Sequence, residues 1–218
     1  MKRSPKELIK RGLCFLTGLY IMSVGIAFSI IGDLGTSPIS SLPYVLNQIT
    51  GFTVGNMTIC MHCCLIIFQI LVLRKRFELY QLLQLPVAFI FGYMVDFSIY
   101  CVSGISYSSY LGQWGLCIIG IVVLALGVSV ELTADVVVLA GEGVVVALCK
   151  VTDIKKGNMK IMVDSSLVAV AAVLSVLFLH KLVGVREGTL ASAIFVGTLV
   201  KFYMKPLAKL ERKLLADS

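Results

Sequence analysis

Residues 52–62 read Phe52-Thr-Val-Gly-Asn-Met-Thr-Ile-Cys-Met-His62, and residues 154–164 repeat the pattern as Ile154-Lys-Lys-Gly-Asn-Met-Lys-Ile-Met-Val-Asp164. The offset of 102 residues also holds upstream, and a slip of three residues extends the match downstream. Other matched pairs are Gly18/Gly120, Gly25/Gly127, Asp33/Asp135, Gly92/Gly197 and Phe97/Phe202. A repeat of about 100 residues is too long for a solenoid unit but typical of the halves of a small transporter. The chain therefore divides into repeat one, residues 12–101, and repeat two, residues 114–204.

The composition is that of an integral membrane protein. Hydrophobic residues make up 58% of the 218 residues, charged residues make up 14%, and the mean hydropathy is +0.97. A soluble domain carries about a quarter charged residues, so this chain lacks the polar surface that water requires. We expect one membrane domain over residues 1–218, embedded in a lipid bilayer and without a soluble domain.

Six segments are long and apolar enough to cross a bilayer, which takes about 20 residues of helix. They are residues 12–31, 56–73, 79–101, 114–132, 158–179 and 187–204. If both chain ends are cytoplasmic, the cytoplasmic ends and loops contain 17 of the 19 basic residues, as the positive-inside rule requires. The net charge of +7 is therefore a topology signal and does not indicate nucleic-acid binding. Both termini, including the basic tail 205–218, are predicted to be cytoplasmic.

Each repeat contains three spans, an odd number, so the second repeat enters the membrane from the opposite side. The expected fold is all-α, with six transmembrane helices in two inverted three-helix repeats related by an axis in the membrane plane. Each repeat also contains an interrupted apolar stretch, residues 34–51 and 136–153, which we interpret as a re-entrant or interfacial short helix. If these stretches crossed fully, the repeats would be parallel and Arg74–Arg76 would lie outside, against the charge distribution.

Two glycine pairs predict a close helix contact. Gly18 and Gly25, like Gly120 and Gly127, lie seven residues apart and therefore on one face of a helix. Small residues allow membrane helices to approach closely, so we expect these faces to be packing surfaces.

Glu142 is the most unusual charged residue of the sequence. It lies between two glycines in the apolar stretch Leu139-Ala-Gly-Glu-Gly-Val-Val-Val146. A carboxylate at membrane depth is costly unless it is paired or hydrated. We interpret Glu142 as a contact for a proton, cation or substrate at the tip of the second short helix. The alternative is a hydrated position at the cytoplasmic interface.

His62 and Asp164 occupy matching positions in the two repeats, each six residues beyond an asparagine. If both face the repeat interface near the midplane, an acid and an imidazole there would form a proton relay. The alternative pairs Asp164 with Lys160, one helical turn earlier, and leaves His62 as a packed polar residue.

Two further pairs of repeat mates complete the candidate substrate-binding residues. Asn56 and Asn158 each begin a helix, where an asparagine caps free amides or binds a polar group. Asp33 and Asp135 each follow a span and would cap the short helix or lie at its entrance.

The sequence offers little support for metal binding or catalysis. Met57, Cys60, Met61 and Cys64 form a helical stripe of soft ligands suited to Cu(I), but repeat two retains only half of it. We interpret the stripe as packing and predict no metal or other cofactor. The sequence also lacks the common motifs of hydrolases, zinc proteases, phosphate loops and dinucleotide sites. We therefore predict no catalytic residues and no enzymatic activity.

Two motifs carry a family resemblance. They are Asp33-Leu-Gly-Thr-Ser-Pro38, followed by Thr53-Val-Gly55, and Val183-Gly-Val-Arg-Glu-Gly-Thr-Leu-Ala-Ser-Ala193, followed by Val196-Gly197. Over residues 12 to 205 the chain resembles the YczE/YitT-type bacterial membrane proteins, and the YczE side in particular. The resemblance implies a multi-pass protein of the bacterial plasma membrane and implies no substrate.

The inverted repeat and the polar residues at membrane depth favour a transporter or channel for a small solute or ion. Its site would lie centrally, where the two repeats meet. The alternative is a non-transporting accessory factor that supports a biosynthetic or signalling partner. The sequence identifies neither the substrate nor a coupling ion, and it leaves open whether the protein is a homo-oligomer.

Overall fold

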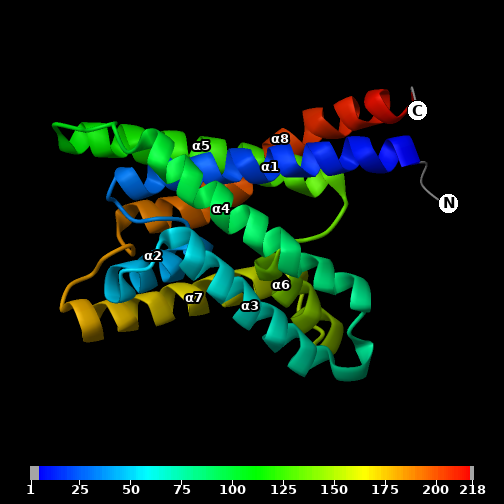
Figure 1. The fold of residues 1–218 in the computed structure, drawn as a ribbon, viewed down its shortest axis with the longest axis horizontal. Coiled ribbons are helices and arrows are strands. Elements are labelled where there is room, and N and C mark those ends of the chain that lie inside the picture. Colours follow the sequence, from blue (N-terminus) through cyan, green and yellow to red (C-terminus); the bar gives the residue numbers. More distant parts are fainter. Residues whose placement is uncertain (1–4, 217–218) are drawn as a thin grey trace.

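The computed structural model describes residues 5–216, with side chains described as far as residue 208, and every regular element in that range is a helix (Figure 1). The long helices are α1 (Pro5–Ile31), α3 (Val54–Leu73), α4 (Gln84–Val102), α5 (Tyr110–Ala134), α7 (Lys156–Leu179) and α8 (Glu187–Ala216). The short ones are α2 (Pro38–Thr50), α6 (Ala140–Val151) and the 3-10 helices η1 (Arg74–Arg76) and η2 (Leu79–Leu83). Lys2 and Arg3, at the start of the first basic cluster, and residues 217–218 of the predicted tail lie outside the described residues.

The six predicted spans are confirmed, because six helices of the described chain are long and apolar enough to cross a membrane. Helices α1, α5 and α8 extend several residues beyond the predicted segments, whereas α3 and α7 begin only two residues early. The first residues of the predicted segment 79–101 form the 3-10 helix η2, and α4 begins at Gln84. The largest difference is α8, which continues through Pro206 to Ala216, so most of the predicted tail 205–218 is helical. Lysine, leucine, glutamate, arginine and alanine dominate this stretch, and all are strong helix formers.

The two interrupted stretches form α2 and α6, which are too short to cross. They contain 13 and 12 residues, which is about 20 Å of helix or less, against about 30 Å of hydrocarbon. Pro38 begins α2, since proline lacks an N–H and fits the first helical turn. Gly51 ends it in the left-handed conformation, φ 76°, and donates its N–H to the carbonyl of Asn47, as helix-terminating glycines do.

Helices α1 and α5 pack closely through the glycines that the sequence predicted. A methyl group on Gly18 would lie 2.7 Å from the backbone nitrogen of Glu131, and one on Gly25 would lie 2.5 Å from that of Leu124. Facing them, Gly127 meets Gly18 and Met22, and Gly120 meets Gly25 and Ser29. Because the early residues of α1 contact the late residues of α5, the two helices run antiparallel. The predicted close contact is confirmed.

The other helices are arranged around this pair. Helix α4 packs against α1 and α3, while α8 packs against α5. The short helices lie farther from the pair: α2 contacts α3 and α7, and α6 contacts the same two helices. Figure 1 shows α1, α5 and α8 along one side of the view and α2, α3, α6 and α7 along the other. The largest apolar core lies between α1, α4 and α5 and includes Leu19, Phe91, Val95 and Leu124.

Candidate functional site

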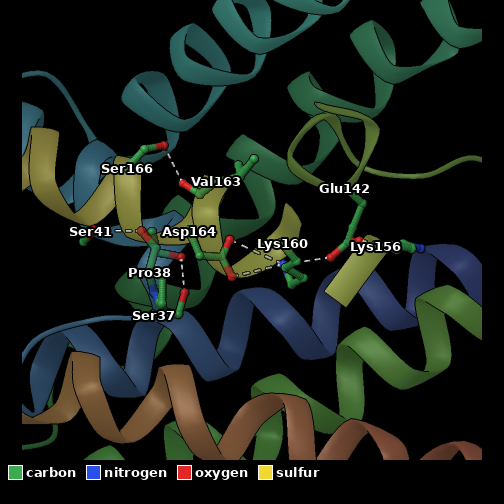
Figure 2. Close-up of polar contacts among 10 residues, drawn as sticks. Ser37, Pro38, Ser41, Glu142, Lys156, Lys160, Val163, Asp164 and Ser166 are labelled. Carbon is green, nitrogen blue, oxygen red and sulfur yellow. Dashed lines mark hydrogen bonds and ion pairs between the residues drawn. The ribbon is translucent and has the colours of Figure 1, made fainter. Parts of the chain in front are cut away.

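A cluster of charged side chains, here called the Lys160 cluster (Glu142, Lys156, Lys160 and Asp164), lies between α6 and α7. The Nζ atom of Lys160 is 2.9 Å from Oε1 of Glu142 and 3.3 Å from Oδ2 of Asp164. Lys156 approaches Glu142 from the other side, with Nζ at 4.0 Å from Oε2. Figure 2 shows Lys160 between the two carboxylates. One ammonium group therefore forms ion pairs with two acids. The side chain of Glu142 is only 18% exposed and that of Asp164 only 23%.

Local helix geometry creates this cluster. Glu142 lies in the first turn of α6, where the helix dipole favours a negative charge. Lys160 and Asp164 are four residues apart on α7, so they share one face of the helix. Asp164 is eight residues beyond the start of α7, or about 12 Å along its axis. The predicted alternative, in which Asp164 pairs with Lys160, is confirmed, and the same lysine also binds Glu142.

The sequence analysis did not identify a third acid, Glu131 of α5, which is 3% exposed. Its carboxylate accepts a hydrogen bond from the backbone of Leu139, the residue before α6, and lies within electrostatic range of Glu142 and Lys160. The sequence did contain a signal, since Glu131 continues the packing face of Gly120 and Gly127 by one more helical turn. A charged residue on a predicted packing face indicates a buried charge, so it could have been found.

Buried serines line the start of the other short helix, α2. Ser37, Ser40 and Ser41 are all at most 6% exposed. Ser37 donates to the hydroxyl of Ser40 at 2.9 Å, and Ser41 donates to the carbonyl of Pro38 at 2.8 Å. Figure 2 draws Ser37 and Ser41 together with the Lys160 cluster, and α2 packs along α7. The short helices also meet at their first turns, where the Ile39 side chain covers Gly141.

His62 lies in a different environment from Asp164, its repeat mate. It is 2% exposed and stacks on Phe91 of α4, with ring centroids 5.9 Å apart and planes at 8°. Its Nδ1 atom has no hydrogen-bond partner among the described residues. No hydrogen bond or ion pair joins it to Asp164 in the described chain, so the structure does not bring this predicted pair together.

The two predicted asparagines are exposed and lie at the starts of α3 and α7. Asn56 is not the cap of α3, because Thr53 occupies that position and its hydroxyl accepts the Asn56 N–H at 3.1 Å. Helix α7 has Lys155 at its cap position and no side-chain cap, so Asn158 does not cap it either. The capping interpretation of both asparagines is therefore wrong, since the cap position of each helix lies three residues earlier, at Thr53 and Lys155.

The two predicted aspartates end α1 and α5 in the left-handed conformation, with φ 51° for Asp33 and 47° for Asp135. Both are exposed, and the cap positions of the short helices are Ser37 and Leu139. Asp33 accepts a 2.7 Å hydrogen bond at its carbonyl from Arg186, whose guanidinium lies 3.8 Å from the Asp33 carboxylate. Aspartate adopts the left-handed conformation more readily than most residues, which explains its use at both helix ends.

A hydrogen-bond network of uncharged side chains, which the sequence analysis did not identify, holds α6 against the first repeat. Gln69 of α3 is 1% exposed and donates to the carbonyl of Ala140 at 3.1 Å and to Oε1 of Gln84 at 3.0 Å. The soft-ligand stripe on the same helix does not converge, because Met61 is buried whereas Cys60 and Cys64 are exposed.

Comparison of the sequence with known proteins assigns the chain to a family. Residues 9–205 match DUF6198, a family of unknown function. The chain belongs to this family. It is 34% identical over 116 residues to the uncharacterized protein YyaS of Bacillus subtilis (strain 168), an alignment that covers 53% of this chain and 56% of YyaS. It is 29% identical over 130 residues to the uncharacterized membrane protein YczE of the same strain, covering 59% of this chain and 58% of YczE.

These matches confirm the predicted resemblance to YczE-type proteins and the membrane location of this DUF6198 member. No solved structure matches the chain. The alignments span little more than half the length of each relative, and neither relative has an assigned activity. The chemistry of the DUF6198 member must therefore be argued from its own residues. In the Lys160 cluster, Lys160 pairs with both Glu142 and Asp164, so the two acids share one positive charge.

Proposed function

We propose that this protein moves a small solute or ion across the bacterial plasma membrane through a site formed by the Lys160 cluster and the serines of α2. The observation that carries the proposal is the position of Lys160 between Glu142 and Asp164, where a short helix meets a spanning helix. Ionisable groups within membrane spans are costly and usually mark solute or proton pathways. A protein that only supported a partner could replace them with apolar residues at no loss of stability.

The helix contacts support an inverted arrangement of the two repeats. Gly18 meets Gly127, and Gly25 meets Gly120. Exchanging each residue for its repeat mate converts the first contact into the second. Ile39 contacts Gly141. The two are repeat mates, so exchanging them leaves this contact unchanged. Such exchange is expected of two halves related by a two-fold axis in the membrane plane, the arrangement of many secondary transporters.

We also propose that both termini face the cytoplasm. The basic segments support this orientation, because Lys150 of α6 lies beside the link between α3 and α4. Its Nζ atom is 3.2 Å from Glu78, and Arg76 donates to its carbonyl at 3.4 Å. Two basic segments from different repeats therefore lie at the same end of the molecule, as the positive-inside rule favours.

A single cysteine tests this orientation. In a chain whose seven native cysteines are replaced, Lys75→Cys is expected to react with a membrane-impermeant maleimide only after the cells are permeabilised. Ser108→Cys, in the exposed loop between α4 and α5, is the control and is expected to react in intact cells. Labelling of the first variant and not the second in intact cells would reverse the proposed orientation.

Asp164→Asn tests the site. A screen of small ions and polar solutes by thermal shift in detergent first supplies a ligand, and uptake into proteoliposomes then measures its movement. The variant retains the shape of the side chain and removes one of the two acids on Lys160, so we expect it to fold. Ligand response and flux are expected to fall by about tenfold or more, the effect of losing one charge of a recognition pair.

Asp153→Asn is the matched control, since Asp153 is an exposed acid in the loop between α6 and α7. It is expected to retain both ligand response and flux. Unchanged flux in Asp164→Asn would contradict the proposed site. A protein that responds to none of the solutes and moves none of them would favour the accessory-factor alternative.

A further inference from the structure

The two repeats pack their last two helices differently. In repeat one, α3 and α4 pack against each other, whereas the equivalent helices α7 and α8 do not pack along their described lengths. Figure 1 shows α7 and the body of α8 at different sides of the view. Burial follows the same division: 33% and 28% of the apolar windows of α3 and α4 are buried, against 17% and 6% for α7 and α8. We call a repeat closed when its last two helices pack against each other and open when they do not. By this definition repeat one is closed and repeat two is open.

Glycines identify the surfaces that would close. In repeat one, a methyl group on Gly55 would overlap the carbonyl of Gly92, and one on Gly92 would lie 2.7 Å from the carbonyl of Gly55. Their repeat mates are Gly157 and Gly197, and among the described residues no neighbouring element has an atom within 4 Å of the position of a methyl group added at either glycine. The second repeat thus carries the same pair of small residues, but no other helix of the described chain packs on them.

We propose that α7 and α8 close on each other through Gly157 and Gly197, as α3 and α4 do through Gly55 and Gly92, and that the protein alternates between two states. In one state repeat one is closed, as in this structure, and in the other repeat two is closed. This inference rests on the proposed function, because exchange of conformation between inverted halves opens a central site to each side of the membrane in turn.

The polar residues at the two contacts fit this alternation. In the closed repeat, Phe91 of α4 stacks on His62 and leaves it 2% exposed. In the open repeat, Asp164 is 23% exposed and Lys160 is 42% exposed. Closure of α8 over α7 would cover Asp164 as α4 covers His62. The Lys160 cluster is thus accessible in one state and covered in the other.

One contact explains why repeat one is the closed half here. Asp96 of α4 accepts a 2.7 Å hydrogen bond from the backbone N–H of Gly55, a free amide at the start of α3. The repeat mate of Asp96 is Lys201, which has no acceptor to offer the start of α7. The contact between α3 and α4 therefore has a bond that the contact between α7 and α8 lacks, and removing it is expected to shift the balance toward closure of repeat two.

Disulfide trapping tests the proposal, because it captures a state even when that state is rarely populated. Gly157→Cys and Gly197→Cys are combined in the cysteine-free chain, and membranes are oxidised with copper phenanthroline. We expect an intramolecular disulfide, formed faster when Asp96→Ala is added. The control combines Gly157→Cys with Gly115→Cys, since a Cβ atom added at Gly115 also has no close neighbour from another element of the described chain. No cross-link, or equal cross-linking in the control pair, would overturn the proposal.

Gly197→Leu gives a second, independent measurement. The Cβ atom that it adds has no described neighbour from outside its own helix within 4 Å, so the melting temperature is expected to stay the same or rise, because leucine favours a helix more than glycine. Flux of the ligand found by thermal shift is expected to fall by about tenfold or more, since the closed state of repeat two is excluded. Normal flux in this variant would also contradict the proposal.

The two measurements separate the inference from the proposed function. If the cysteines cross-link but no solute or ion moves, the two states exist and the transport proposal fails. If solutes move without cross-linking of the cysteine pair, transport stands and the closure of α8 on α7 is wrong.

Discussion

Gly25→Leu is expected to prevent α1 from packing on α5 and to abolish the stable folded protein. The added Cβ atom would lie 2.5 Å from the backbone nitrogen of Leu124, 2.7 Å from its Cα and 2.9 Å from the carbonyl of Gly120. Non-bonded carbon atoms require about 3.5–4.0 Å, and backbone atoms cannot move aside as a side chain can. The two central helices would have to separate, so we expect a loss of about 3 kcal/mol or more.

The measurement is the melting temperature of the purified protein in detergent, with the monodisperse fraction on gel filtration as a second readout. Gly115→Leu is the matched control, because it makes the same change on α5 at a position where no neighbouring element of the described chain lies within 4 Å of the added Cβ atom. It is expected to behave like the wild type. A Gly25→Leu protein that melts at the wild-type temperature would show that α1 and α5 do not meet through these glycines.

Much of the fold could be predicted because the bilayer imposes strong rules on sequence. Length and hydropathy identified the six spans, since a membrane helix must be long and apolar. The glycine spacing predicted the contact between α1 and α5 because close helix approach requires small residues on one face. The apolar stretches 34–51 and 136–153 are interrupted by prolines, glycines or a charge, which indicated short helices. Without these interruptions, each stretch would have been interpreted as a span of about 18 apolar residues.

The site was harder to predict because its residues come from helices distant in the sequence. Glu142 was identified as a charge in apolar surroundings and Asp164 as the repeat mate of His62, and the lysine that joins the two acids lies one turn from Asp164. Repeat symmetry suggested that His62 and Asp164 would meet. In the structure His62 is buried against Phe91 of α4, whereas Asp164 pairs with Lys160 and is not covered by α8 in the described chain. Equivalence in the sequence does not require equivalent packing, since one half can be closed while the other is open.

The helix starts were misplaced for a local reason. Asn56 and Asn158 are good capping residues, but both lie inside the first turn. The caps are set three residues earlier, where Thr53 accepts the Asn56 N–H and Lys155 precedes α7. Hydropathy does not mark these positions, because the first turn of a span lies in the polar interface, where apolar and polar residues are equally tolerated.

Lys160→Met is expected to destabilise the protein because it removes the positive charge that Glu142 and Asp164 share. Two carboxylates that both lie within 3.3 Å of one ammonium group would be left close together, and the nearby cation that remains is Lys156, at 4.0 Å from Glu142. Removing one partner of a fully buried ion pair costs about 3–5 kcal/mol. The Lys160 side chain is 42% exposed, and exposure weakens such effects, so we expect a smaller loss of about 1–3 kcal/mol.

A triple variant separates this electrostatic cause from simple loss of packing. Adding Glu142→Gln and Asp164→Asn to Lys160→Met removes all three charges while nearly preserving side-chain shape. Replacing a complete buried ion network by uncharged groups is often neutral or stabilising, so the triple variant is expected to recover the wild-type melting temperature in detergent. A triple variant as unstable as Lys160→Met alone would mean that the lysine contributes through packing. Recovery of stability together with loss of flux would instead indicate that these three charges are retained for function and not for stability.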